Sequence, residues 1–137
     1  MQRISVPASK VKETLRAVVA ERPDYVYELP AHMVGTTLDG VPVTEGSCLY
    51  VHTAEDGTRS PGCLVGHVLA RLGAPLEKFE PLEGTGACNV VPVFLDITGE
   101  PDDVREAELE LVYAQCEQDG EATWADALEV ATRKPGE

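Results

Sequence analysis

Residues 60–75 have the sequence Ser60-Pro61-Gly62-Cys63-Leu64-Val65-Gly66-His67-Val68-Leu69-Ala70-Arg71-Leu72-Gly73-Ala74-Pro75. Ser60 can cap a helix through its hydroxyl, and Pro61 suits the first helical position, where a missing N–H loses no hydrogen bond. The apolar residues of the stretch recur at three- and four-residue spacing, which places them on one side of a helix. Gly73 and Pro75 supply the stop. The stretch therefore predicts a helix that is capped by Ser60, begins at Pro61 and ends before Gly73, and the rest of the chain is arranged around it.

Three more helices are predicted beside this one. Residues 8–21 carry apolar residues at helical spacing and stop at Arg22-Pro23, because the residue before a proline is pushed out of the helical region. Residues 100–119 begin with a proline and acids, both of which favour a first helical turn. Thr123 caps a last short helix, in which Trp124 is predicted to anchor the end of the chain in the core.

The strands are expected to be few and short. Cys48–Thr53 alternates like a strand, and Asp56-Gly57 is a hairpin signal that returns the chain to the central helix. Val41-Pro42-Val43 is interpreted as an edge strand, where a sheet tolerates proline. Val90–Ile97 is apolar and β-branched, which favours a strand edged by Pro92 or an extended stretch over the core. These patterns predict an α+β fold with about four helices and a small antiparallel sheet or hairpin, in a single domain over residues 1–137.

The composition narrows the class of protein. The formal net charge of the 137-residue chain is −13, and residues 100–130 hold eleven acids against one base, Arg105. Direct nucleic-acid binding is therefore not expected, because Lys and Arg supply most of that affinity. No apolar run approaches the roughly 20 residues that span a bilayer, and residues 1–7 do not resemble a secretory signal. The expected location is the cytoplasm, without membrane contact, and no cofactor is indicated.

The acidic third helix is the main candidate binding surface. Its candidate residues are Asp102, Asp103, Glu106, Glu110 and Glu117. A negative surface can meet a basic partner protein, including the basic groove of another protein. The alternative is that these side chains form a solvated face that keeps the protein soluble. Three of the chain's eleven bases lie in residues 8–21, so that helix could pack against the acidic region.

Two C-x-x-x-H pairs suggest a metal site, namely Cys48 with His52 and Cys63 with His67. Two thiolates and two imidazoles are a common zinc set. Cys63 and His67 are one helical turn apart and can share an ion. Along a strand, however, Cys48 and His52 would be about 13 Å apart, too far to share one. The alternative is a buried cysteine with a histidine in the core or on the helix surface.

Cys63 and His67 are also the weak candidates for catalysis. A thiol in the first turn of a helix is expected to have a lowered pKa, and a histidine one turn later could act as its base. A cysteine at such a position can equally be a small buried residue, and no further catalytic group is identifiable. Gly66, inside the same helix, is interpreted as a site of close approach by a neighbouring segment.

Two segments carry a resemblance. Cys48–Val51 followed by Pro61–Leu69 is similar to a strand–turn–helix in a group of small proteins of actinobacteria and their phages, for which no activity is established. Residues 114–128 resemble the C-terminal segment of the same proteins. The resemblance covers about a third of the chain. It implies an α+β domain of actinobacterial or phage origin, and it implies no activity.

Together these features favour a small acidic, non-enzymatic binding protein that acts on a host or phage protein, in one version as a decoy for a basic groove. The alternatives are a thiol- or zinc-dependent enzyme centred on Cys63 and His67, and a structural or assembly protein of a virion. The sequence leaves the oligomeric state open.

Overall fold

The computed structural model describes residues 2–133, so residues 1 and 134–137 of the predicted single domain lie outside the described range. The α-helices are α1 (Ala8–Glu21), α2 (Leu64–Arg71), α3 (Ala87–Phe94), α4 (Pro101–Asp119) and α5 (Trp124–Thr132), and the 3-10 helices are η1 (Ala31–Met33), η2 (Leu76–Lys78) and η3 (Glu80–Leu82). The strands are β1 (Ile4–Pro7), β2 (Thr37–Leu38), β3 (Val41–Pro42), β4 (Val51–Thr53), β5 (Arg59–Pro61) and β6 (Leu95–Thr98). The α+β prediction is confirmed, with five α-helices in the described range rather than four.

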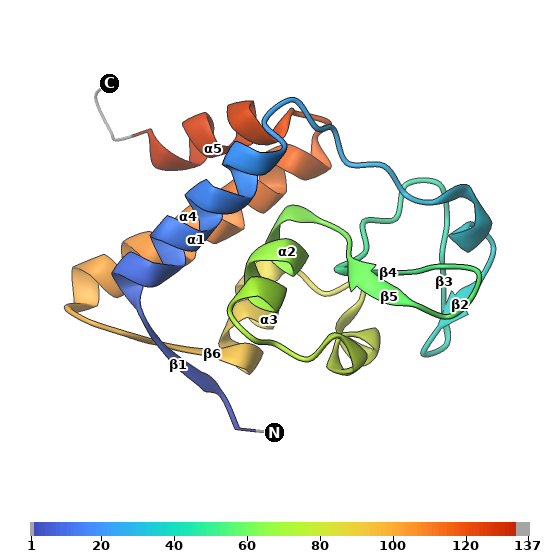
Figure 1. Ribbon diagram of the computed structural model, residues 1–137, viewed down its shortest axis with the longest axis horizontal. Coiled ribbons are helices and arrows are strands. Elements are labelled where there is room, and N and C mark those ends of the chain that lie inside the picture. The colour runs from blue at the N-terminus through green and yellow to red at the C-terminus, as the bar shows by residue number, and fades with distance from the viewer. Residues whose placement is uncertain (1, 134–137) are drawn as a thin grey trace.

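The helices and most strands occupy opposite ends of the molecule (Figure 1). Helix α1 lies along α4, and α5 packs beside both. Their buried faces join α2 and α3 in the main core, which is built largely from Val, Leu and Ala. Trp124, at the start of α5, is fully buried, and its backbone N–H donates to the carbonyl of Tyr25, so the predicted anchor of the C-terminal segment is confirmed. No helix within residues 2–133 is both long and apolar enough to cross a membrane.

The strands form three separate pairs, two of which are antiparallel hairpins, as expected, while the third pair is parallel. Strands β4 and β5 are antiparallel, and the predicted Asp56-Gly57 turn joins them with Gly57 at a φ of 90°. Strands β2 and β3 form a second antiparallel pair, which confirms the edge strand at Val41-Pro42. Strands β1 and β6 are parallel, with Ile4 opposite Leu95, so the first residues of the chain are tied to a segment about ninety residues later.

Helix α2 begins at Leu64, three residues after Pro61, the predicted first helical position. Ser60 and Pro61 belong to β5, where Pro61 lies opposite Val51, so neither starts the helix. The N-cap residue is Cys63, and its side chain makes no capping hydrogen bond. At the other end Gly73 has a φ of 109°, which confirms the predicted stop.

Residues 90–94 are helical, so the strand or extended stretch predicted over Val90–Ile97 is wrong for its first five residues. Helix α3 buries Val90, Val91 and Phe94 on one face, and only the residues from Leu95 onward form a strand. Pro92 is exposed on the opposite face. Burial of three large side chains outweighs both β-propensity and the hydrogen bond that proline cannot make.

The predicted close approach of a neighbouring segment to Gly66 is confirmed. A Cβ atom built on Gly66 would overlap with the backbone carbonyl oxygen of Tyr50. Helix α2 therefore rests directly on the chain that leads into β4. This contact fixes the position of the N-terminus of α2 and of the thiol groups near it.

Candidate functional site

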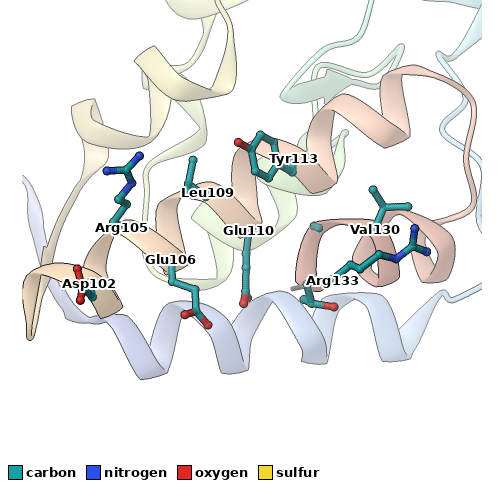
Figure 2. Close-up of a pocket in the computed structure, with 10 residues that line it drawn as sticks. Asp102, Arg105, Glu106, Leu109, Glu110, Tyr113, Val130 and Arg133 are labelled. Atoms are coloured by element: carbon teal, nitrogen blue, oxygen red, sulfur yellow. The ribbon is translucent and has the colours of Figure 1, made fainter. Parts of the chain in front are cut away.

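A groove of about 560 Å³ runs between α4 and α5, above α1 (Figure 2). It is lined by Asp102, Arg105, Glu106, Leu109, Glu110, Tyr113, Val130, Ala131, Thr132 and Arg133. Three of the five acidic residues predicted as a binding surface are among them. The α4 periodicity explains this, because residues three and four apart project from the same side of a helix.

Two of those acids are engaged inside the protein. The carboxylate of Glu106 lies 2.5 Å from the ammonium nitrogen of Lys12, and Arg16 Nη1 donates to Glu110 Oε1 at 2.8 Å. Figure 2 shows both carboxylates directed toward α1. The predicted packing of the basic first helix against the acidic helix is thus confirmed. As a consequence, the charges of Glu106 and Glu110 are largely compensated, and Glu110 is only 5 % exposed.

The upper part of the groove is apolar and open to solvent. Tyr113 is 50 % exposed and Val130 is 38 % exposed, and Leu109 lies between the exposed and buried sides of α4. In Figure 2, Leu109 and Tyr113 project away from α1, on the side opposite the paired acids. A groove lined by an exposed aromatic ring and an exposed aliphatic side chain is typical of a contact surface for another protein.

The other predicted acidic residues lie elsewhere. Asp103 borders a separate hollow at the start of α1, next to Lys12 and Gly99. Glu117 is half-buried, two turns further along α4, and does not line the groove. The structure therefore brings together Asp102, Glu106 and Glu110 but does not bring Asp103 and Glu117 to the same site.

Comparison with models of known protein families, with curated proteins and with solved structures finds no match to this chain.

Cys63 and His67 do not form a nucleophile and its base. Burial raises the pKa of the Cys63 thiol well above its usual value, which is opposite to the direction predicted from the helix start. The imidazole of His67 packs edge-on against Trp124, with ring centroids 5.2 Å apart, while Cys63 faces Cys48. A fully buried thiol with little thiolate at neutral pH is poorly placed to attack a substrate that arrives from solvent. The helix dipole is outweighed here by desolvation.

The four residues considered for zinc do not converge either. His52 Nε2 lies 2.7 Å from the hydroxyl of Tyr27, and burial lowers its pKa to about 4. His67 lies against Trp124, so only Cys48 and Cys63 are neighbours. Among residues 2–133 no group of three His, Cys, Asp or Glu side chains is placed to hold a metal ion.

Sequence reasoning missed a buried polar cluster at the start of α2. Gln118 Oε1 accepts the N–H of Leu64 at 2.8 Å, and Gln115 Oε1 accepts the N–H of Val65 at 3.0 Å. Both glutamines are almost fully buried. They cap α2 from another helix, which explains why Cys63 needs no cap of its own. The signal was present in the sequence, because both continue the apolar stripe of α4 at a spacing of four residues, from Leu111 and Ala114.

Glu83 is a second buried polar group that the sequence did not indicate. Its carboxylate accepts the backbone N–H groups of Tyr50 at 2.7 Å and Val51 at 3.2 Å, and the residue is 8 % exposed. Burial raises its pKa to about 7, and the two hydrogen bonds offset only part of that effect. Glu83 thus supports the chain that enters β4, the same chain on which Gly66 rests.

Stability is expected to fall as the pH rises from about 4.5 through 7 because of Glu83. Its pKa is raised in the folded protein, so the folded state keeps a proton that the unfolded chain loses above pH 4.5. This contribution to the free energy of unfolding is at most about 3 kcal/mol. It is fully present below pH 4.5 and is lost as the pH rises through 7. Urea unfolding at intervals between pH 4.5 and 8 measures it, and Glu83→Gln should flatten the profile.

Glu77→Gln is the matched control, because it removes one exposed carboxylate from the neighbouring 3-10 helix η2. The control variant keeps His52, whose effect on stability has the opposite pH dependence. Because the pKa of His52 is lowered in the folded protein, its contribution to the free energy of unfolding is present above about pH 6.5 and is lost as the pH falls toward 4. A profile that is unchanged in Glu83→Gln, or equally changed in Glu77→Gln, would contradict the assignment to Glu83.

Proposed function

We propose that this protein is a small non-enzymatic binding protein whose partner protein docks in the groove between α4 and α5. The observation that carries the proposal is that exposed Tyr113 and Val130 line, together with Leu109, one groove of about 560 Å³. Aromatic side chains that are already held by a helix are frequent anchors of protein interfaces. The partner is expected to be a host or phage protein, as the resemblance to actinobacterial and phage proteins implies.

The acidic surface is assigned a steering role. Lys12 and Arg16 compensate Glu106 and Glu110, and Arg105 and Arg133 also line the groove, so the groove itself is nearly neutral. The chain as a whole carries a formal charge of −13, which attracts a basic partner over a distance of about 10 Å at moderate salt. The acids therefore set the association rate, and the apolar side chains set the dissociation rate. A decoy that works through its acidic helix alone is less well supported.

Photo-cross-linking tests this proposal. A photoreactive phenylalanine derivative replaces Tyr113, and in a matched control it replaces Val41, which is equally exposed but lies on β3 at the other end of the molecule. Each protein is irradiated in an actinobacterial lysate, and the cross-linked products are identified by mass spectrometry. We expect one dominant partner from position 113 and none from position 41.

The purified partner then separates the two contributions. Tyr113→Ala is expected to weaken binding roughly tenfold through faster dissociation, whereas Val41→Ala leaves it unchanged. Raising the salt concentration should slow association in both variants and in the wild type. Equal capture from both positions, no capture from position 113, or an unchanged dissociation rate in Tyr113→Ala would contradict the proposal.

A further inference from the structure

Two thiols meet at the start of α2, away from the groove. Cys63 is the N-cap residue of α2, and Cys48 lies on the chain that enters β4. The backbone N–H of Cys63 donates to the carbonyl of Leu49 at 3.0 Å, which holds the two segments together. The side chains of Cys48 and Cys63 interact directly. This arrangement gives the pair the proximity that an intramolecular disulfide needs.

The sulfur of Cys48 has an unusual set of neighbours. Gln115 Nε2 and Gln118 Nε2 donate to it, at 3.2 and 3.3 Å. The carboxylate of Asp119 accepts from both of those amides and from the Cys48 thiol. Because Asp119 accepts the hydrogen bond of the thiol and two amides hold its sulfur in place, Cys48 is the member of the pair that is fixed in position to meet an oxidant.

The two thiols differ in access to solvent. Cys48 is partly exposed and lines a hollow of about 330 Å³ together with Tyr27, Gly46 and Asp119. Cys63 is fully buried behind it. A small oxidant can therefore reach Cys48 from the hollow, whereas Cys63 can react only with Cys48. That order of access is typical of an attacking thiol and its resolving thiol.

We propose that Cys48 and Cys63 are a dithiol that a hydroperoxide oxidises to an internal disulfide. The Cys48 sulfur attacks the terminal peroxide oxygen, an S–O bond forms, the O–O bond breaks, and the thiol proton passes by way of Asp119 to the departing alcohol or water. The Cys63 sulfur then attacks the Cys48 sulfur, an S–S bond forms, and the S–O bond breaks. The proton of Cys63 leaves with the hydroxide as water. Two thiols and one hydroperoxide thus yield one disulfide, one alcohol or water, and one water.

The test uses full-length protein carrying Cys88→Ser and Cys116→Ser, which remove the two exposed cysteines. One equivalent of hydrogen peroxide is added to the reduced protein, and the intact mass, free thiols and digest are measured. We expect both thiols to be lost together, a mass lower by two hydrogen atoms, and a peptide containing Cys48 linked to one containing Cys63. Dithiothreitol should restore both thiols. Further replacement Cys63→Ser should leave a Cys48 sulfenic acid that dimedone traps, and Cys48→Ser should abolish the loss of the Cys63 thiol.

Three results would overturn the proposal: no thiol oxidation, stable oxidation of Cys48 alone while Cys63 is intact, or disulfide-linked dimers in place of the internal bond. Peptide mapping of the protein that carries Cys88→Ser and Cys116→Ser distinguishes these results from the expected internal disulfide, and it does not depend on whether the other variants fold. Binding through Tyr113 is measured separately, so either proposal can fail without the other.

Discussion

Gly66→Ala is expected to destabilise the protein by about 2–3 kcal/mol, although alanine is the better helix former. In an unhindered helix the change would stabilise by about 1 kcal/mol. Here the added Cβ overlaps with the carbonyl oxygen of Tyr50, and the carbonyl carbon and Cα of Tyr50 lie 3.0 and 3.1 Å from it. These are backbone atoms that no side-chain rotation can move, so α2 or the chain entering β4 must shift and the surrounding core must repack.

Urea unfolding of the purified variants measures this effect. Gly46→Ala is the matched control, because a Cβ at Gly46 meets nothing within 4 Å. That variant should unfold within a few tenths of a kcal/mol of the wild type or slightly later. A Gly66→Ala protein that is more stable than the wild type would show that the approach of α2 to Tyr50 is looser than described.

Gln118→Leu is expected to cost about 2–3 kcal/mol, although leucine has a similar volume and the site is buried. The N–H of Leu64 loses its acceptor at 2.8 Å, and Asp119 and Cys48 lose a donor. An unpaired buried amide costs on the order of 1–3 kcal/mol. The loss also falls on the first turn of α2, where no side chain of that helix supplies a replacement.

Gln115→Leu should behave similarly, because its Oε1 accepts the neighbouring N–H of Val65. The double variant should lose less than the sum of the two single losses, since both glutamines cap the same helix end. Glu108→Leu, at an exposed position of the same helix, is the control and should stay within about 0.5 kcal/mol of the wild type. Urea unfolding with amide exchange at Leu64 measures these effects. Unchanged exchange at Leu64 in Gln118→Leu would refute the capping role.

Local patterns predicted the elements whose signals lie within them. Helix α1 occupies the predicted residues, and α5 starts after Thr123, whose hydroxyl accepts the N–H of Asp126 at 3.2 Å. The hairpin at Asp56-Gly57 is equally local. The predicted start of α2 was wrong because the side chains that cap this helix belong to Gln115 and Gln118, about fifty residues away. No pattern near Ser60 contains that information.

The candidate site was predictable only in part. Composition located the acidic helix, and the spacing of its acids placed three of them on one side. The sequence did not indicate that Arg16 pairs with Glu110 or that Tyr113 stays exposed, because both depend on how α1 and α5 pack against α4. For Cys63, a position at the start of a helix does favour a lower pKa. Full burial of the thiol raises the pKa by more, and no local sequence pattern indicates how deeply that side chain is buried.

The parallel pairing of β1 with β6 has a consequence for how the molecule is made. Ile4–Pro7 can find its partner only after Leu95–Thr98 has been synthesised, which takes roughly 5–20 s at ordinary translation rates. Helix α1 can pack against α2 early, but it also waits for α4 and α5, so part of its apolar face lacks its final neighbours while the ribosome works. A nascent chain with such distant contacts folds late and is a natural client for chaperones that shield apolar surface. Moving β1 and α1 to the C-terminus by circular permutation would remove the delay.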